Sequence, residues 1–270
     1  MIGEKVVASH PEDSLLRADR LPHIWCPGCG LGAITTSYTR ALQESDVDRD
    51  RHVTVSGIGC TGRVAGYVHV DSFHTTHGRP IPFATGLKIY NPELEVTVIS
   101  GDGDLFAIGG NHFIHAARRD APINVFCVNN FNYAMTGGQH GPTSPVGSNS
   151  PTTPAGVSDR PFNLPRLALA LGANYVARWT SLHVRQLQRS MQQALNTPGF
   201  TFIEILSPCP IGYGKSNGIG DGLDEMRHYR DHCVVDDKAS IYDMEIDLRA
   251  DAPVVLGVFR RDGERKKPRD

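Results

Sequence analysis

The sequence has 270 residues, of which 40% are hydrophobic, and its formal net charge is −2. One large α/β core with extensions fits this length better than two domains, and the charge implies no field that attracts nucleic acid or membranes. No stretch reaches transmembrane length and residues 1–5 lack an apolar signal region, so we expect a cytoplasmic protein.

Helical and extended patterns alternate along the chain. In chain order, the predicted elements are a helix at 30–43, a strand at 52–56, a strand at 95–100, a helix at 105–119, a strand at 123–128, a helix at 164–171, a strand at 175–178, a helix at 182–195 and a strand at 200–206. This order predicts an α/β fold in which a parallel sheet carries helices on both faces. Ligands of such sheets bind at the carboxyl ends of the strands.

Four of the six cysteines lie in turns rich in glycine or proline. Cys26 and Cys29 form a Cys-x-x-Cys pair, Cys60 follows the first predicted strand and Cys209 follows the last. Such turns expose N–H groups that can bond the sulfides of an iron–sulfur cluster. By itself, the pair also suits a redox dithiol, half a zinc site or a helix-start turn. A lone cysteine after a buried strand is often only part of the core.

Polar residues end two of the predicted buried strands. Gly101-Asp102-Gly103 follows one strand, and the pair Asn129-Asn130 ends the next. The glycines permit a sharp turn, the carboxylate is a hard oxygen ligand, and the neighbouring strand brings an amide oxygen beside it. The start of the helix predicted between them would add an anion site. Together these features suit a magnesium-bridged diphosphate, and the simpler alternative is a plain turn at each place.

Two long segments do not follow the strand–helix alternation. The segment 137–161 is longer than an ordinary connection, and we expect it to be a functional loop. We divide the chain into an N-terminal extension (1–20), an α/β domain (21–210) and a C-terminal extension (211–270) that we expect to pack on a partner subunit. The basic stretch within the last extension is typical of a solvated tail and only weakly indicates a docking site for an acidic carrier.

Four motifs occur in the same order in the β subunits of 2-oxoacid:ferredoxin oxidoreductases. They are Trp25-Cys26-Pro27-Gly28-Cys29-Gly30, Gly57-Ile58-Gly59-Cys60-Thr61-Gly62-Arg63, His74-Thr75-Thr76-His77-Gly78-Arg79 and Gly101-Asp102-Gly103-Asp104. The sequence resembles this family over residues 20–215. The resemblance implies the thiamine diphosphate-binding form of the α/β fold, with Mg²⁺ and a [4Fe–4S] cluster as further cofactors.

The resemblance also implies roles for individual residues. The cluster would be held by Cys26, Cys29, Cys60 and Cys209. The side chains of Asp102 and Asn130 and the backbone carbonyl of Asn132 would bind Mg²⁺. His77 would act in catalysis by bonding the diphosphate or a developing oxyanion. The residues in contact with thiamine diphosphate would be Ile58, Gly59, Cys60, Thr61, His77, Gly101, Asp102, Gly103, Asp104, Asn130 and Thr136.

The family's reaction is the oxidative decarboxylation of a 2-oxoacid with coenzyme A, reversible in principle. Electrons leave through the cluster to ferredoxin. The glutamate that activates thiamine diphosphate in such enzymes lies on a separate pyrimidine-binding domain. The resemblance therefore implies an α subunit and an αβ or (αβ)₂ assembly.

The substrate is indicated by the segment 132–139. Gly137 follows Thr136 where other family members have a lysine, and this looks more like the 2-oxoglutarate enzymes, which form succinyl-CoA. Pyruvate or a broad range of 2-oxoacids stays an alternative, because the carboxylate-binding arginines would lie on the α subunit. A non-oxidative thiamine decarboxylase would keep Asp102 and Asn130 but would not need four turn cysteines. A zinc-stapled scaffold subunit would keep the cysteines but would not need the diphosphate motif.

Overall fold

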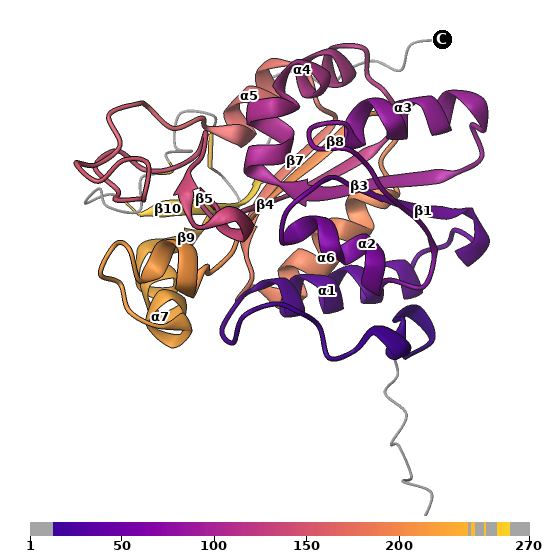
Figure 1. Cartoon of the computed structure of the whole chain (residues 1–270). Coiled ribbons are helices and arrows are strands. Elements are labelled where there is room, and N and C mark those ends of the chain that lie inside the picture. Colours follow the sequence, from indigo (N-terminus) through magenta and orange to yellow (C-terminus); the bar gives the residue numbers. More distant parts are fainter. Residues whose placement is uncertain (1–12, 237–238, 241–245, 247–252, 260–270) are drawn as a thin grey trace, which may run out of the picture.

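An eight-stranded sheet lies between two layers of helices in the computed structural model (Figure 1). The structure describes residues 13–236, 239–240, 246 and 253–259. The strands are β1 (His52–Ser56), β2 (Asp71–His74), β3 (Glu95–Gly101), β4 (Asn124–Asn129), β7 (Tyr175–Thr180), β8 (Thr201–Leu206), β9 (Cys233–Val235) and β10 (Val254–Phe259), and β5 (Asn132–Tyr133) and β6 (Gln139–His140) form a separate hairpin. The helices are α1 (Leu31–Gln43), α2 (Val64–Tyr67), α3 (Pro80–Tyr90), α4 (Gly110–Arg118), α5 (Leu164–Ala170), α6 (Val184–Leu195) and α7 (Gly222–His232).

The strand order in the large sheet is β2-β1-β3-β4-β8-β7-β10-β9. The strands from β2 to β7 in this order are parallel, which confirms the predicted fold class. The other edge differs from the prediction, because β10 runs antiparallel to β7 and β9 pairs with β10. Both of these strands belong to the segment 211–270, so part of the expected C-terminal extension completes the main sheet. Residues 1–12 of the expected N-terminal extension and the basic stretch 260–269 lie outside the described residues.

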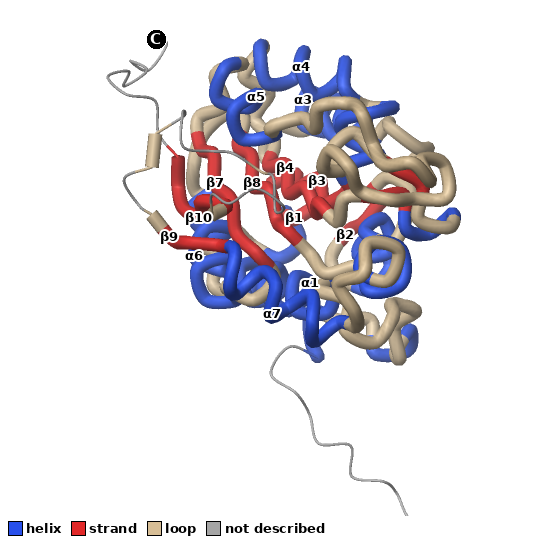
Figure 2. The backbone as a smooth tube through the Cα atoms, turned by 90° about the vertical axis from the view of Figure 1, so that its left-hand side faces the viewer, coloured by secondary structure: helices blue, strands red, loops and turns tan. Residues whose placement is uncertain are grey.

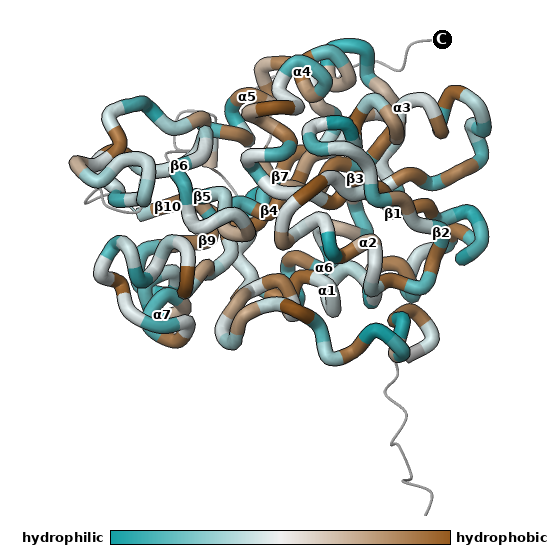
Figure 3. Tube along the Cα trace, viewed as in Figure 1, coloured by the Kyte–Doolittle hydropathy of each residue, from teal (hydrophilic) through white to brown (hydrophobic). Residues whose placement is uncertain are grey.

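Two hydrophobic cores lie on the two faces of the sheet. One core contains side chains from α1, α2, α6 and α7, and the other contains side chains from α3, α4 and α5. Figure 2 shows α1, α6 and α7 on one side of the sheet and α3, α4 and α5 on the other. The central strand β4 serves both cores, since Phe126 contacts the first and Val125 the second. Hydrophobic residues accordingly follow the central strands in Figure 3. Full burial of each such side chain stabilises the fold by roughly 1.5–3 kcal/mol.

The helix predicted at residues 105–119 is divided in the structure. Gly103–Ile108 forms a π-helical turn, closed by a 3.0 Å bond from the Gly109 N–H to the Asp104 carbonyl, and α4 begins only at Gly110. The prediction of one continuous helix at 105–119 was wrong, because the wider turn interrupts the regular hydrogen-bond pattern. None of the helices in the described residues combines the length and the hydropathy needed to cross a membrane.

A buried ion pair crosses the sheet between β7 and β8. Arg178 and Glu204 face each other in the parallel register, and their side chains are fully buried with Nε and Oε2 2.6 Å apart. The second carboxylate oxygen of Glu204 accepts a 2.8 Å hydrogen bond from the amide of Asn129 at the end of β4. Removing one partner of such a pair costs about 3–5 kcal/mol, because a buried charge is left uncompensated. The pair therefore anchors a polar network inside the sheet.

Candidate functional site

One cleft opens where β1, β3 and β4 end. The carboxyl ends of neighbouring parallel strands meet at this edge, so turns that are distant in the sequence come together. The cleft is lined by Ile58, Gly59, Cys60, Thr61, His77, Gly101, Asp102, Gly103, Asp104, Asn130, Asn132, Tyr133, Ala134, Met135 and Thr136. These include every residue that the sequence suggested for contact with thiamine diphosphate. The structure adds Tyr133, Ala134 and Met135, whose only signal in the sequence is their place after the asparagine pair.

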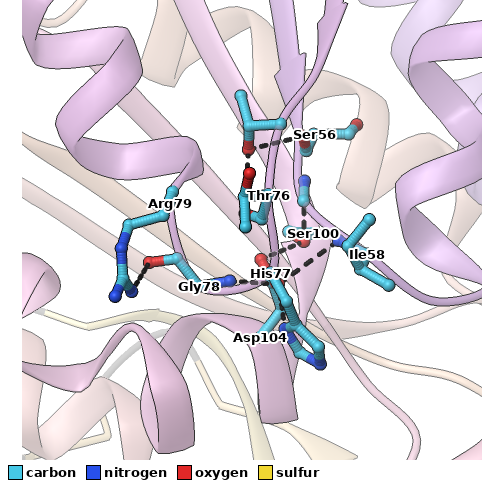
Figure 4. Close-up of polar contacts among 10 residues, drawn as sticks. Ser56, Ile58, Thr76, His77, Gly78, Arg79, Ser100 and Asp104 are labelled. Atoms are coloured by element: carbon cyan, nitrogen blue, oxygen red, sulfur yellow. Dashed lines mark hydrogen bonds and ion pairs between the residues drawn. The ribbon is translucent and has the colours of Figure 1, made fainter.

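Asp104 joins two of the turns that form the cleft (Figure 4). Its Oδ1 accepts hydrogen bonds from the Ile58 N–H (3.2 Å), the Gly78 N–H (2.7 Å) and the His77 imidazole (2.5 Å). Its Oδ2 accepts a 2.9 Å bond from the Ser100 hydroxyl. Both carboxylate oxygens are thus bonded within the protein, and the residue is only 2% exposed. Asp104 therefore shapes the cleft mainly by fixing the two turns.

Gly57 is required by the close approach of Asp104. A Cβ at this position would lie 1.9 Å from the Asp104 Oδ2. We expect Gly57→Ala to lower stability by about 1–3 kcal/mol, because Asp104 is held on all sides and overpacking of this kind strains its surroundings. The urea midpoint of the purified full chain measures this effect. Gly86→Ala in α3 is the matched control, since a Cβ there meets no atom within 4 Å and alanine favours a helix by about 1 kcal/mol. Equal midpoints for the two variants would contradict the prediction.

His77 lines the cleft, and one of its ring nitrogens is bonded to Asp104. Its Nδ1 contacts the Asp104 carboxylate, and its side chain is about one-third exposed (33%). A carboxylate only accepts hydrogen bonds, so Nδ1 carries a proton. The Nε2 of the neutral ring is then the nitrogen that can accept a hydrogen bond. The Tyr133 ring lies edge-on at 6.4 Å and borders the same cleft.

Asp102 is a carboxylate buried at the end of β3, with 2% exposure. Burial raises its pKa to about 6, although a hydrogen bond from the Thr143 hydroxyl acts in the opposite direction. Among the described residues, the ion pairs do not include Asp102, so its ionised form has no cationic side chain beside it. A divalent cation would supply the missing positive charge, and carboxylate and amide oxygens are suitable ligands for Mg²⁺. Asn130 and Asn132 line the same cleft, so the residues fit this ion.

The four turn cysteines lie close enough to affect one another. Burial raises the pKa of the Cys29 thiol to about 12, with further contributions from Cys209, Cys60 and Cys26. The pKa of Cys60 is raised to about 11 by burial and by Cys209 and Cys26. Thiolates brought together in this way repel each other unless a cationic centre binds them. In the described part of the chain, however, no group of three or more His, Cys, Asp or Glu side chains is arranged as a ready-made metal site.

Comparison with known proteins identifies the family. Residues 57–205 match the family model for the thiamine pyrophosphate enzyme, C-terminal TPP binding domain, and this region contains the whole cleft. The chain is 46% identical over 253 residues to the 2-oxoglutarate synthase subunit KorB of Methanothermobacter marburgensis, covering 94% of this chain and 88% of that protein. It is 45% identical over 250 residues to the KorB subunit of Methanocaldococcus jannaschii, covering 93% and 92%. The chain belongs to the KorB family.

The fold of this KorB-family chain is also found in a solved structure. That structure is a 2-oxoglutarate:ferredoxin oxidoreductase from Magnetococcus marinus with 2-oxoglutarate, coenzyme A and succinyl-CoA bound. The TM-score is 0.81 at 31% identity, and the match covers 97% of this chain and 88% of that chain. The resemblance inferred from the motifs is thereby confirmed, and the KorB cleft lies in a thiamine diphosphate-binding domain.

Proposed function

We propose that this chain is the β subunit of a thiamine diphosphate-dependent 2-oxoglutarate:ferredoxin oxidoreductase. The enzyme converts 2-oxoglutarate and coenzyme A to succinyl-CoA and CO₂ and passes the electrons to ferredoxin in the cytoplasm. The observation that carries this proposal is the cleft within the matched cofactor-binding region, where Asp102, Asn130 and His77 meet. The names of the relatives favour 2-oxoglutarate over pyruvate, as does Gly137 after Thr136.

The cleft holds the cofactor through a metal ion in this proposal. Asp102 and Asn130 bind Mg²⁺ with their side chains, and Asn132 with its backbone carbonyl. Bound thiamine diphosphate supplies a nucleophilic carbon and an electron sink. Because the Asp104 carboxylate fixes His77, the free Nε2 is oriented in advance, and when protonated it can donate a hydrogen bond to the diphosphate or to a developing oxyanion. No side chain of this chain is needed as the nucleophile.

The four turn cysteines bind a [4Fe–4S] cluster beside this cleft. Cys60 lines the cleft itself, while Cys209 and the pair Cys26 and Cys29 come from other turns near it. Such a cluster accepts electrons one at a time, which suits transfer to ferredoxin. A non-oxidative decarboxylase or a zinc-bound scaffold would not need it. Iron and sulfide analysis of the anaerobically purified protein therefore separates the three functions.

The rim of the cleft indicates a partner subunit. Ile58 and Met135 line the cleft and are 40% and 47% exposed, and Ile108, which lies against Gly78 next to His77, is 49% exposed. Exposed apolar side chains around a binding site are typical of a surface that another protein covers. We propose that the α subunit binds here and brings the glutamate that activates the cofactor.

Reconstitution tests this division of labour. The purified full chain, supplied with iron, sulfide, Mg²⁺ and thiamine diphosphate, should not oxidise 2-oxoacids by itself. Addition of the α subunit should produce coenzyme A-dependent reduction of ferredoxin or a viologen dye with 2-oxoglutarate. Robust activity of the isolated chain would overturn the shared active site. A preference of the complex for pyruvate would overturn only the substrate assignment.

A further inference from the structure

A chain of buried polar side chains runs behind the cleft from β7 to the end of β3. Arg178 pairs with Glu204, which accepts from the Asn129 amide at 2.8 Å. The Asn129 Oδ1 lies 2.9 Å from the Thr143 hydroxyl, and the same hydroxyl lies 2.5 Å from the Asp102 Oδ2. All five residues are at most 2% exposed. This network connects separate segments of the chain at the edge of the sheet where the cleft lies.

Thr143 has a central place in the network. Its hydroxyl carries one proton, and this proton faces two acceptors, a carboxylate oxygen of Asp102 and the amide oxygen of Asn129. Without the proton, these two oxygens would face each other in a buried site with no donor between them, which is unfavourable. The hydroxyl therefore ties the turn after β3 to the turn after β4.

The turn after β4 depends on the same network. A carboxylate only accepts, so the amide nitrogen of Asn129 must face Glu204 and its oxygen must face Thr143. That oxygen also accepts a 3.1 Å bond from the N–H of Phe131, a residue held at a positive φ of 62°. The network thus keeps an uncommon backbone turn in place. Asn130 lies in this turn and lines the cleft.

We infer that Thr143 is a positioning residue that sets the affinity of the site for Mg²⁺ and hence for thiamine diphosphate. This inference rests on the magnesium–diphosphate site proposed above. Thr143 does not line the cleft and acts through Asp102 and Asn129. It stops the Asp102 carboxylate from rotating and holds that carboxylate at a fixed separation from Asn130. Residues that orient metal ligands in this way typically change metal affinity by about 10-fold to 100-fold when mutated.

Titration calorimetry of the assembled enzyme tests the inference. The enzyme is freed of thiamine diphosphate and Mg²⁺ with a chelator, and the cofactor is titrated at limiting Mg²⁺. Thr143→Val removes the hydroxyl with little change in volume, and we expect about 10-fold weaker binding, with recovery as Mg²⁺ is raised. Thr143→Ser keeps the hydroxyl and should bind like the wild type. If Thr143→Val does not assemble, Thr143→Ala replaces it with the same expected loss.

Thr201→Val is the matched control. Thr201 in β8 is also fully buried, and its hydroxyl donates to the Asn124 Oδ1 at 2.6 Å. Asn124 begins β4, whereas Asn129, the partner of Thr143, ends it. This variant should lower the unfolding midpoint but leave the cofactor affinity unchanged. Equal affinities of Thr143→Val and the wild type would overturn the inference, as would an equal loss of affinity in the Ser variant or in Thr201→Val. Failure of the wild type to bind would instead overturn the proposed magnesium–diphosphate site, and the inference with it.

Discussion

Replacing Cys60 with alanine should remove most of the iron from the assembled enzyme and abolish the reduction of ferredoxin. Cys60 lies in the turn after β1, and its thiol interacts with those of Cys209 and Cys26. Three remaining thiolates would leave one iron without its protein ligand, and such clusters are lost easily. Iron and sulfide analysis and the visible spectrum of the anaerobic protein measure this loss.

Cys233→Ala is the control for this experiment. Cys233 is a half-buried thiol in β9, apart from the four turn cysteines. Its replacement removes a thiol of similar burial and should keep the iron content and the activity. A full iron content in the Cys60 variant would refute our ligand assignment.

Replacing Asp102 with alanine should weaken the binding of thiamine diphosphate by about 10-fold to 100-fold or more. The metal would lose its carboxylate ligand, and the diphosphate would face less positive charge. The cofactor-free variant should be at least as stable as the cofactor-free wild type. Burial disfavours the ionised carboxylate of Asp102 and raises its pKa to about 6, so its removal relieves an unfavourable buried charge. Calorimetric titration and urea denaturation of the same preparations measure the two effects.

Asp120→Ala provides the contrast. The Asp120 Oδ1 accepts hydrogen bonds from the Phe200 N–H at 3.0 Å and from the Asn174 amide at 2.9 Å. Asp120 does not line the cleft. Its loss should lower the unfolding midpoint without changing the cofactor affinity. An unchanged affinity in the Asp102 variant would exclude this carboxylate as a ligand.

The buried strands could be predicted from the sequence because their apolar runs are continuous. The strand predicted at 52–56 coincides with β1, and that at 200–206 differs from β8 by one residue. Strands with helices on both faces are apolar throughout, so their length and bounding turns define them well. The first helix was predicted equally well, since α1 presents a regular apolar face to the core.

Other elements gave a weak or misleading signal. β2 is largely exposed and carries polar residues, so it shows no buried pattern. α3 begins with Pro80 and contains Gly86, which are typical of turns, although proline is favourable in the first turn of a helix. β10 follows a long polar stretch and is held as a strand by its pairing with β7, a contact that local sequence does not reveal.

The residues of the cleft were predictable, but their connections were not. The parallel order alone places Asp102 and Asn130 at one edge of the sheet. The bonds that use both oxygens of Asp104, and the bridge made by Thr143, depend on turns that meet only in the folded chain. Thr143 lies in the segment 137–161, which the sequence predicts to be a functional loop from its length, but the hydrogen-bond partners of Thr143 could not be named.

The late strand β10 closes the edge of the sheet next to the buried Arg178. The Val255 carbonyl accepts a 3.4 Å bond from Arg178, and the Phe259 ring lies 5.9 Å from the same guanidinium. The cleft and the four turn cysteines leave the ribosome before these residues do. A chain that stops early would therefore carry all the proposed cofactor ligands but would leave an open strand edge beside an incompletely covered arginine. We expect proteases to remove such truncated chains, which limits the iron and thiamine diphosphate bound by incomplete subunits.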